Sequence, residues 1–349
     1  MNIIHNYKSM FKLDYSKYKF VLLGESTHGT DDYYIIRKKI TEYLIEKYEY
    51  NCIFFEMEWS YGYMLNKYIH NNLKISIKNL LKQVFTEYPK WMWCNQHIKN
   101  LLLYLKRHNK INKYHKIYIY GTDCQNIELA KKNVCNDKKS LNCSIVNKII
   151  NNYAKMKNSS NYWNMRDTMW YNIIEYVKKV RNINNDKFIL WAHDSHIGDV
   201  RGYQNDANKL NIGYLLKKKY NHKCLNIGFS TFSGQVTASH NWGSKNLVFN
   251  VKPATKKSWE YIFHNYCIKN KISSLLFISK KNASNFCFKK SKSYCNRIQK
   301  QYKSRKIRYI GVIYSPYSED ISHYTNTDID IEYDILVFID NTKALKSFC

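Results

Sequence analysis

Short apolar runs that alternate with helix-patterned segments are the feature that most constrains the fold of this 349-residue chain. The run "KFVLLG" (19–24) precedes a helical pattern over Asp31–Lys47, and "CIFFEME" (52–58) follows it. Strands separated by a single helix pair in parallel, because a hairpin cannot join them. Similar buried-type runs lie at 116–123, 187–199, 224–231, 273–279, 308–315 and 333–342. The pattern predicts an α/β fold with a largely parallel central sheet flanked by helices.

The middle of the chain is mostly helical, and no linker divides it. Apolar residues at helical spacing predict helices over Met64–His70, Ile77–Val84, Trp91–Asn109 and Trp163–Val180. Residues 126–161 are rich in Asn, Lys and Ser, with one weak helical pattern at Ile145–Met156, and we interpret them as a helical, variable insertion. Because neither an internal repeat nor a Pro/Gly/Ser-rich linker occurs, we expect residues 1–349 to form a single domain.

The net charge is unusually high. The chain carries 56 Lys and Arg against 27 Asp and Glu, a formal net charge of +29. A charge of this size attracts nucleic acid and other polyanions. However, the excess is mostly lysine, spread along the whole chain beside abundant Asn, Ile and Tyr. We therefore favour a composition bias on solvated faces over a dedicated nucleic-acid site.

Targeting signals and cysteine spacing give the expected location. The N-terminal segment has no apolar core of a signal peptide, and no apolar run approaches the ~18 residues that a membrane span needs. Ten cysteines are scattered without a C-x-x-C pair, which predicts reduced, mostly buried thiols. We expect a soluble cytoplasmic protein.

Acidic and imidazole side chains follow three of the expected strands at the point where each ends. They are Glu25 and His28 in "GESTHGT", then Glu56 and Glu58, then His193, Asp194, His196 and Asp199. Each group has a simpler explanation, such as a helix cap by Thr27 or Thr30, a rim carboxylate or a hydrogen-bonded loop. Ligands bind beyond the carboxyl ends of parallel strands, so three such ends in one sheet favour a functional site.

Other residues and absent motifs narrow the chemistry. Arg37 lies nine residues after His28 and could reach back to a carboxylate or meet an oxyanion. Glutamate and histidine at these strand ends could also ligate zinc or iron, but H-E-x-x-H and paired cysteines are absent, so a metal is the less favoured alternative. G-x-S-x-G, Walker A and G-x-G-x-x-G sequences are absent too, which disfavours the usual serine hydrolases and the commonest nucleotide sites.

Ten stretches, in order from about Phe20 to Leu345, resemble the erythromycin esterase family. They are "GESTHGTDDYYIIRKKIT", "FFEMEWSYGYMLNKYI", "YPKWMWCN", "YGTDCQN", "YWNMRDTMWYN", "WAHDSHIGDVRG", "LNIGYLLKKKY", "NIGFSTFSGQVTASHNWG", "YIGVIYSPYSEDISHY" and "DILVFIDNTKAL". The resemblance implies an α/β sheet beside helical elements that wall a deep cleft. It also implies that His28 is the base that activates water, with Glu25, Glu56, Arg37 and His193 as the other catalytic residues.

On this resemblance we expect an enzyme that cleaves an ester or lactone without a cofactor or a bound metal. His28 would deprotonate water, and Arg37 or His193 would meet the oxyanion. The expected substrate-binding residues are His196, Trp93 and Asp199. The partner would be a small-molecule ester or lactone, with macrolides and hence antibiotic resistance among the possibilities. Two alternatives stay open: a metal-dependent hydrolase that uses the same residues, and a non-catalytic protein that binds a polyanion.

Overall fold

A computed structural model describes residues 2–135, 140–154, 159–182, 185–203, 208–282 and 304–348. In these residues nine strands form one sheet in the order β1-β8-β11-β6-β2-β5-β3-β4, with β7 paired to β6, while β9 and β10 form a separate pair. The strand bounds are β1 Asn2–His5, β2 Phe20–Leu23, β3 Cys52–Glu58, β4 Tyr118–Asp123, β5 Phe188–Trp191, β6 Cys224–Ala238, β7 Leu247–Val251, β8 Ser274–Ile278, β9 Arg305–Arg308, β10 Tyr324–Thr327 and β11 Ile335–Thr342.

The central strands β11, β6, β2, β5, β3 and β4 run in parallel, whereas β1, β8 and β7 join antiparallel. The predicted α/β fold with a largely parallel sheet is therefore confirmed. The strand expected at 308–315 is wrong beyond Arg308: β9 ends there, and Ile310 and Ile313 make only single bridges, to Thr27 and Ser239. Without a neighbouring strand to form a ladder, this apolar stretch crosses the sheet end as a loop.

Helices cover both faces of the sheet. Their bounds are α1 Asp31–Tyr48, α2 Trp59–Ile69, α3 Ile77–Val84, α4 Gln96–Ile111, α5 Ile127–Val134, α6 Leu141–Ile145, α7 Asn151–Ala154, α8 Tyr162–Arg181, α9 Asp194–Ile197, α10 Ile212–Tyr220, α11 Trp259–Asn270, α13 Glu319–Ser322 and α14 Ile329–Glu332, with a π-helical turn at Val146–Ile150 and short 3-10 turns at Tyr7–Lys12, Lys90–Met92, Val200–Gly202, Asn221–Lys223 and Lys280–Asn282. The expected helix at Trp91–Asn109 begins later, at Gln96, because Asn95 accepts hydrogen bonds from two backbone N–H groups and caps it.

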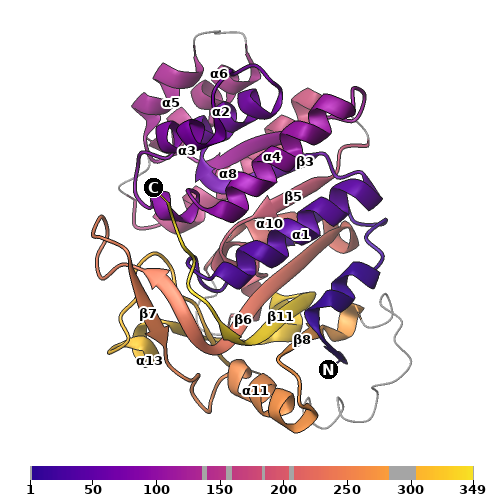
Figure 1. The fold of residues 1–349 in the computed structure, drawn as a ribbon, viewed down its shortest axis with the longest axis vertical. Helices are drawn as coiled ribbons and strands as arrows, with labels where there is room; N and C mark the ends of the chain where they lie inside the picture. The colour runs from indigo at the N-terminus through magenta and orange to yellow at the C-terminus, as the bar shows by residue number, and fades with distance from the viewer. Residues whose placement is uncertain are drawn as a thin grey trace.

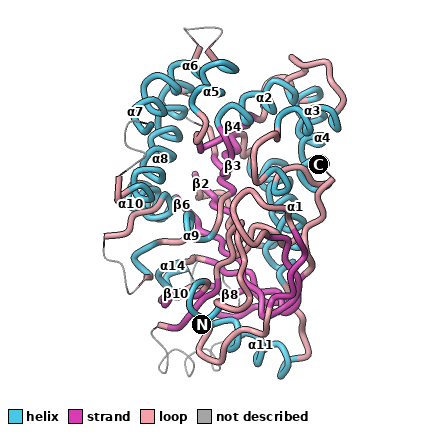
Figure 2. Tube along the Cα trace, turned by 90° about the vertical axis from the view of Figure 1, so that its left-hand side faces the viewer, coloured by secondary structure: helices cyan, strands magenta, loops and turns pink. Residues whose placement is uncertain are grey.

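Alternating residues of β2 show why two helical layers form. Val21 and Leu23 pack into the cluster under α1, α3 and α4, whereas Phe20 and Leu22 pack into the cluster under α8, α10 and α11. Successive side chains of a strand point to opposite faces, so an all-apolar strand requires cover on both sides. Figures 1 and 2 show the sheet with α1 and α4 on one side and α8 and α10 on the other.

The strand order changes direction between β2 and β5, which lie side by side. From β2 the chain crosses through α1 to β3, beyond β5, and from β5 it crosses through α10 to β6, beyond β2. Connections that leave neighbouring strands on opposite faces open a crevice at the strands' carboxyl ends, where α/β proteins bind ligands. The topology thus places the segments after β2, β5 and β3 around one such crevice.

Two expectations about the chain's middle are partly corrected. The segment 126–161 is more helical than the one weak pattern at Ile145–Met156 indicates, since α5, α6, the π-helical turn and α7 all lie in it; residues 155–156 of that pattern lie outside the described residues.

Cys135 and Cys143 form a disulfide with Cα atoms 4.6 Å apart, and Cys94 is also disulfide-bonded, so the expectation of reduced thiols is wrong for these three. Throughout the described ranges, no helix is long and apolar enough to cross a membrane.

Candidate active site

The turn after β2 brings Glu25, His28 and Arg37 together. His28 Nδ1 lies 3.0 Å from Glu25 Oε1, and Arg37 Nη2 donates to the other oxygen, Glu25 Oε2. A carboxylate only accepts hydrogen bonds, so in a neutral His28 ring Nδ1 carries the proton and Nε2 keeps a lone pair. Arg37 is fully buried on α1, with its guanidinium 4.6 Å from the ring of Tyr34 and 4.5 Å from that of Trp191. Arg37 therefore lies beneath Glu25 and positions it, rather than facing a substrate.

His193, which follows β5, lies next to His28, with ring centroids 4.7 Å apart. Its Nδ1 accepts the backbone N–H of Ser195 at 3.2 Å, so a neutral His193 carries its proton on Nε2. Nε2 is buried and has no well-formed hydrogen bond to any described residue, although the nearby backbone of Ser26 and Ile310 raises the pKa of the ring in part. Burial and the neighbouring His28 and His196 hold the pKa of His193 well below its usual range. His193 is thus a neutral donor at pH 7, with the opposite tautomer to His28.

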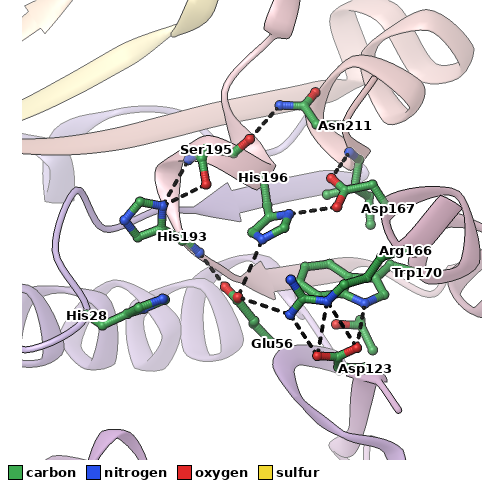
Figure 3. Close-up of polar contacts among 12 residues, drawn as sticks. His28, Glu56, Asp123, Arg166, Asp167, Trp170, His193, Ser195, His196 and Asn211 are labelled. Atoms are coloured by element: carbon green, nitrogen blue, oxygen red, sulfur yellow. Dashed lines mark hydrogen bonds and ion pairs between the residues drawn. The ribbon is translucent and has the colours of Figure 1, made fainter. Parts of the chain in front are cut away.

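Glu56 of β3 completes the group. Its Oε2 accepts the backbone N–H of His193 at 2.7 Å. Its Oε1 lies 3.5 Å from His196 Nε2 and 3.7 Å from Arg166 Nη2. In Figure 3 the His28 ring points toward the side of the cluster where Glu56 lies. The structure therefore brings Glu25, His28, Glu56, Arg37 and His193 to the carboxyl ends of three adjacent strands, as the sequence predicts.

His196, expected to bind substrate, is buried, and a substrate role for it stays a prediction. It is buried between the rings of Trp163, stacked at 4.3 Å, and Trp170, at 4.4 Å. Its Nδ1 donates to Asp167 at 2.7 Å, which leaves Nε2 toward Glu56 (Figure 3). The Asp167–His196 pair thus mirrors the Glu25–His28 pair on the far side of Glu56.

Four site residues on α8 were not predicted from the sequence: Trp163, Arg166, Asp167 and Trp170. They stand at positions i, i+3, i+4 and i+7, so they share one face of the helix. Arg166 donates to Asp123, at the end of β4, with both Nε and Nη2. The signal available in the stretch "YWNMRDTMWYN" was the pair Arg166 and Asp167, which helical spacing places on the same face as the two tryptophans.

Asp123 was also missed, although it ends β4 as Glu58 ends β3. Burial opposes ionisation of Asp123, but the Arg166 guanidinium outweighs it and lowers the pKa of the carboxyl. The opposite holds for Glu58, because burial and the charge of Asp123 raise its pKa to about 7. The pKa values of neighbouring buried carboxylates move apart in this way when an arginine forms an ion pair with only one of them.

Two expected substrate-binding residues lie outside these contacts. Trp93 is buried in the hydrophobic core, edge-on to Phe55 with ring centroids 5.8 Å apart. Asp199 is fully buried, and its carboxylate accepts from both Nε and Nη2 of Arg201. A substrate role for Trp93 and Asp199 stays a prediction.

Gly29 shows how tightly the turn is held. It accepts backbone N–H groups of Thr237 and Leu345, at 3.0 and 2.8 Å, and an added Cβ would come within 1.8 Å of the Thr237 carbonyl oxygen. We expect Gly29→Ala to reduce the free energy of unfolding by about 3 kcal/mol, because backbone atoms must move to admit the methyl group. Urea denaturation would measure the loss. Gly311→Ala is the control, since its Cβ would meet no atom of the described residues within 4 Å. Equal stability of the two variants would contradict this account of the turn.

Two buried acids, Asp194 and Glu332, support the loop that carries His193. Asp194 Oδ2 accepts the Phe229 backbone N–H at 3.0 Å, whereas its Oδ1 has no hydrogen-bond partner among the described residues. Glu332 Oε1 accepts from the hydroxyl of Tyr309. Burial raises the pKa of Asp194 well above its usual range, and burial raises that of Glu332 to about 7. These carboxyls are therefore stable in the fold mainly as neutral acids.

The raised pKa of Glu332 gives a pH-dependent stability. An unfolded glutamate loses its proton near pH 4.3, whereas the folded one keeps it to about 7, so between these values the folded state binds more protons. Stability from this group is complete below about pH 4.3 and is lost as pH rises through 7. We expect Glu332→Gln to gain on the order of 3 kcal/mol relative to the unsubstituted protein between about pH 4 and 8. Urea unfolding across this range measures it, and a constant difference would contradict it.

The donor atoms of the group do not form an open set of metal ligands. Among the described residues no three His, Cys, Asp or Glu side chains are grouped to hold an ion. Both oxygens of Glu25 already accept hydrogen bonds, one of them from Arg37, whose charge would repel a cation. The arrangement suits acid–base chemistry, in which one imidazole accepts a proton and its neighbour donates a hydrogen bond.

A cavity of about 460 Å³ lies between α8 and the helical segment 126–161, and its lining includes Met165, Thr168, Met169 and Asn172. These residues occupy the side of α8 away from Arg166 and Asp167. The cavity is therefore separate from the histidine cluster.

Comparison with known proteins shows chains of similar fold. A protein from Bacillus cereus is 16% identical, with a TM-score of 0.68 over 96% of this chain and 91% of that one. A succinoglycan biosynthesis protein is 16% identical, with a TM-score of 0.67 over 97% and 91%. A mutant of the erythromycin esterase EreC in its open conformation is 12% identical, with a TM-score of 0.60 over 100% and 99%. The erythromycin esterase sequence profile matches residues 45–137 and 136–342, so the chain belongs to the erythromycin esterase family.

Proposed function

We propose that this protein hydrolyses a carboxylic ester or lactone with water activated by His28. The observation that carries the proposal is the hydrogen bond between His28 Nδ1 and Glu25, which leaves Nε2 as a base beside the neutral donor His193. Family membership supports a hydrolase. We further propose that residues 1–349 act as one domain in the cytoplasm on a small-molecule substrate.

The proposed reaction begins when His28 Nε2 takes a proton from water as the water oxygen attacks the substrate carbonyl carbon. The carbonyl π electrons move to its oxygen, and the Nε2–H of His193 donates a hydrogen bond to that oxyanion. When the intermediate collapses, the ester C–O bond breaks and the leaving alkoxide takes the proton from the His28 imidazolium. A buried N–H without a well-formed hydrogen bond is costly, and since no described residue accepts that of His193 in this way, the step gives it a function.

Glu25 and Glu56 have different parts in this scheme. Glu25 fixes the tautomer of His28 and stabilises the imidazolium, as the third member of a catalytic triad does. Glu56 holds the His193 backbone N–H and thereby the position of the donor. Arg37 pairs with the Glu25 carboxylate and holds it in place, which is one of the two roles that the sequence left open for it.

The test is a panel of esters and lactones, macrolides included, because one similar structure is an erythromycin esterase. We expect the unsubstituted protein to hydrolyse at least one panel member and the His28→Asn variant to lose that activity. His222→Asn is the matched control, since His222 is exposed on a turn before β6. If no member of the panel is hydrolysed, or if His28→Asn is as active as the control variant, the proposal is wrong.

A metal-dependent hydrolase using the same residues is the competing mechanism. We expect activity without stoichiometric metal, because the candidate ligands are already engaged. Glu25 binds Arg37, and His28 and His193 each use Nδ1 in a hydrogen bond within the protein. Elemental analysis of active protein, with assays after dialysis against a chelator, measures this. Loss of activity that one equivalent of zinc restores would establish the competing mechanism instead.

A further inference from the structure

A second cavity, of about 830 Å³, lies at the opposite end of the sheet from the histidine cluster. Its lining includes Lys19, Asn51, Lys187 and Lys223, each of which lies immediately before one of the parallel strands β2, β3, β5 and β6. The histidine cluster lies at the carboxyl ends of β2, β3 and β5, so the length of these strands separates the two sites. A function of this cavity is therefore distinct from the proposed hydrolysis.

The lining of this cavity is strongly basic. Seven of its sixteen residues are Lys or Arg, against 56 of 349 in the whole chain, so a uniform composition bias does not account for it. The lining has two carboxylates, Glu49 and Asp186. Asp186 is already used, because it accepts two hydrogen bonds from Arg181 and one from Asn51. Among the described residues of the lining, Glu49 is the carboxylate that these hydrogen bonds do not use.

Several of these lysines lack a carboxylate partner in the described part of the chain. Lys17, Lys113, Lys116 and Lys223 form no ion pair there, and Lys187 donates only to the carbonyl oxygens of Ser16 and Tyr48. Crowding also affects Lys19: burial and the nearby Lys178 and Lys223 lower the pKa of its ammonium group. Positive charges gathered in one concavity repel one another unless an anion enters.

Helix ends provide another explanation for basic residues at this pole. The helices α1, α4, α8 and α10 end here, and each helix C-terminus carries about −0.5 of an elementary charge, about −2 in total. Four partial charges of this size offset only part of the charge of the five lining lysines that form no ion pair in the described part of the chain. The negative ends of the helix dipoles therefore neutralise only part of the lysine charge, and a substantial positive charge remains in the cavity.

We propose that this cavity binds a small oligophosphate anion, such as a nucleoside di- or triphosphate. The volume lies in the range of small-molecule sites, which favours a compact ligand over an extended nucleic acid. Rings are available beside the charges: Tyr114 is fully exposed, and Tyr118 has the Arg181 guanidinium 4.0 Å from its ring centre. A planar base could stack on Tyr114 while the phosphates meet the lysines.

The experiment measures binding of inorganic tripolyphosphate, ATP and a single-stranded oligonucleotide to the full chain by calorimetry. One triple variant removes cavity charges: Lys113→Gln, Lys116→Gln and Lys223→Gln. A matched control removes three exposed lysines near and on α3: Lys74→Gln, Lys78→Gln and Lys82→Gln. Thermal melts of both variants show whether each is folded. Because none of these lysines belongs to the histidine cluster, ester hydrolysis is a separate readout.

We expect saturable binding of tripolyphosphate, weakened about tenfold in the cavity variant and less than about twofold in the control. Bound anion should also raise the melting temperature of the unsubstituted protein more than that of the cavity variant. Tighter binding of ATP than of tripolyphosphate would identify a nucleotide, and equal binding would identify the phosphates alone. The proposal is overturned if neither anion saturates, if both triple variants weaken binding equally, or if only the oligonucleotide binds.

Discussion

His28→Asn should lower kcat for the hydrolysed ester by two or more orders of magnitude while leaving the melting temperature nearly unchanged. Asparagine fits the turn, but it cannot accept and return a proton near neutral pH. The substitution removes the base and leaves Glu25 paired with Arg37, so no buried charge loses its only partner. Initial rates at saturating substrate, with thermal melts alongside, provide the measurement.

Glu56→Gln is the comparison for this result. It should cost less than His28→Asn, because a glutamine oxygen can still accept the His193 backbone N–H. If His28→Asn keeps more than about a tenth of the kcat, a loss smaller than removal of a general base normally gives, His28 is not the base.

Arg37→Met should destabilise the protein by about 3–5 kcal/mol and abolish activity. Both Arg37 and Glu25 are at most 1% exposed, so removing the guanidinium leaves a buried carboxylate without its ion-pair partner. The double variant Arg37→Met with Glu25→Gln should recover most of that stability, because it no longer buries an unpaired charge. Its activity should stay low, since a glutamine cannot stabilise the His28 imidazolium.

Urea unfolding of both single variants and the double variant measures this coupling. If the double variant is no more stable than Arg37→Met, the ion pair is not what holds the turn. Recovery of activity along with stability would show that Glu25 has no part in orienting His28.

The sequence predicts the core of the candidate site because its residues follow short apolar strands. Glu25, His28, Glu56 and His193 lie just after or near the ends of β2, β3 and β5, and parallel strands bring their carboxyl ends to one edge. Arg37 could be anticipated because a helix that begins at the turn carries it back over the same edge. Local pattern and topology are sufficient for these residues.

The α8 contribution could not be predicted in the same way. Arg166 and Asp167 reach the site only because α8 packs on the sheet with that face inward, which depends on contacts with β4 and α10. Likewise, the sequence does not show that His196 is enclosed by Trp163 and Trp170, or that Trp93 packs against Phe55. Burial and long-range pairing decide which polar side chain faces a substrate and which supports it.

The central claim is that His28 and His193 have opposite tautomers, so that one is a base and the other a donor. It can be measured without knowing the substrate, by ¹⁵N NMR of the imidazole nitrogens at about pH 8, where unperturbed histidines are neutral. Spectra of His28→Asn and His193→Asn assign the signals. We predict a proton on Nδ1 and a bare Nε2 for His28, with a proton on Nε2 and a bare Nδ1 for His193. A proton on Nε2 of His28 would contradict the claim, because that nitrogen could not then take a proton from water.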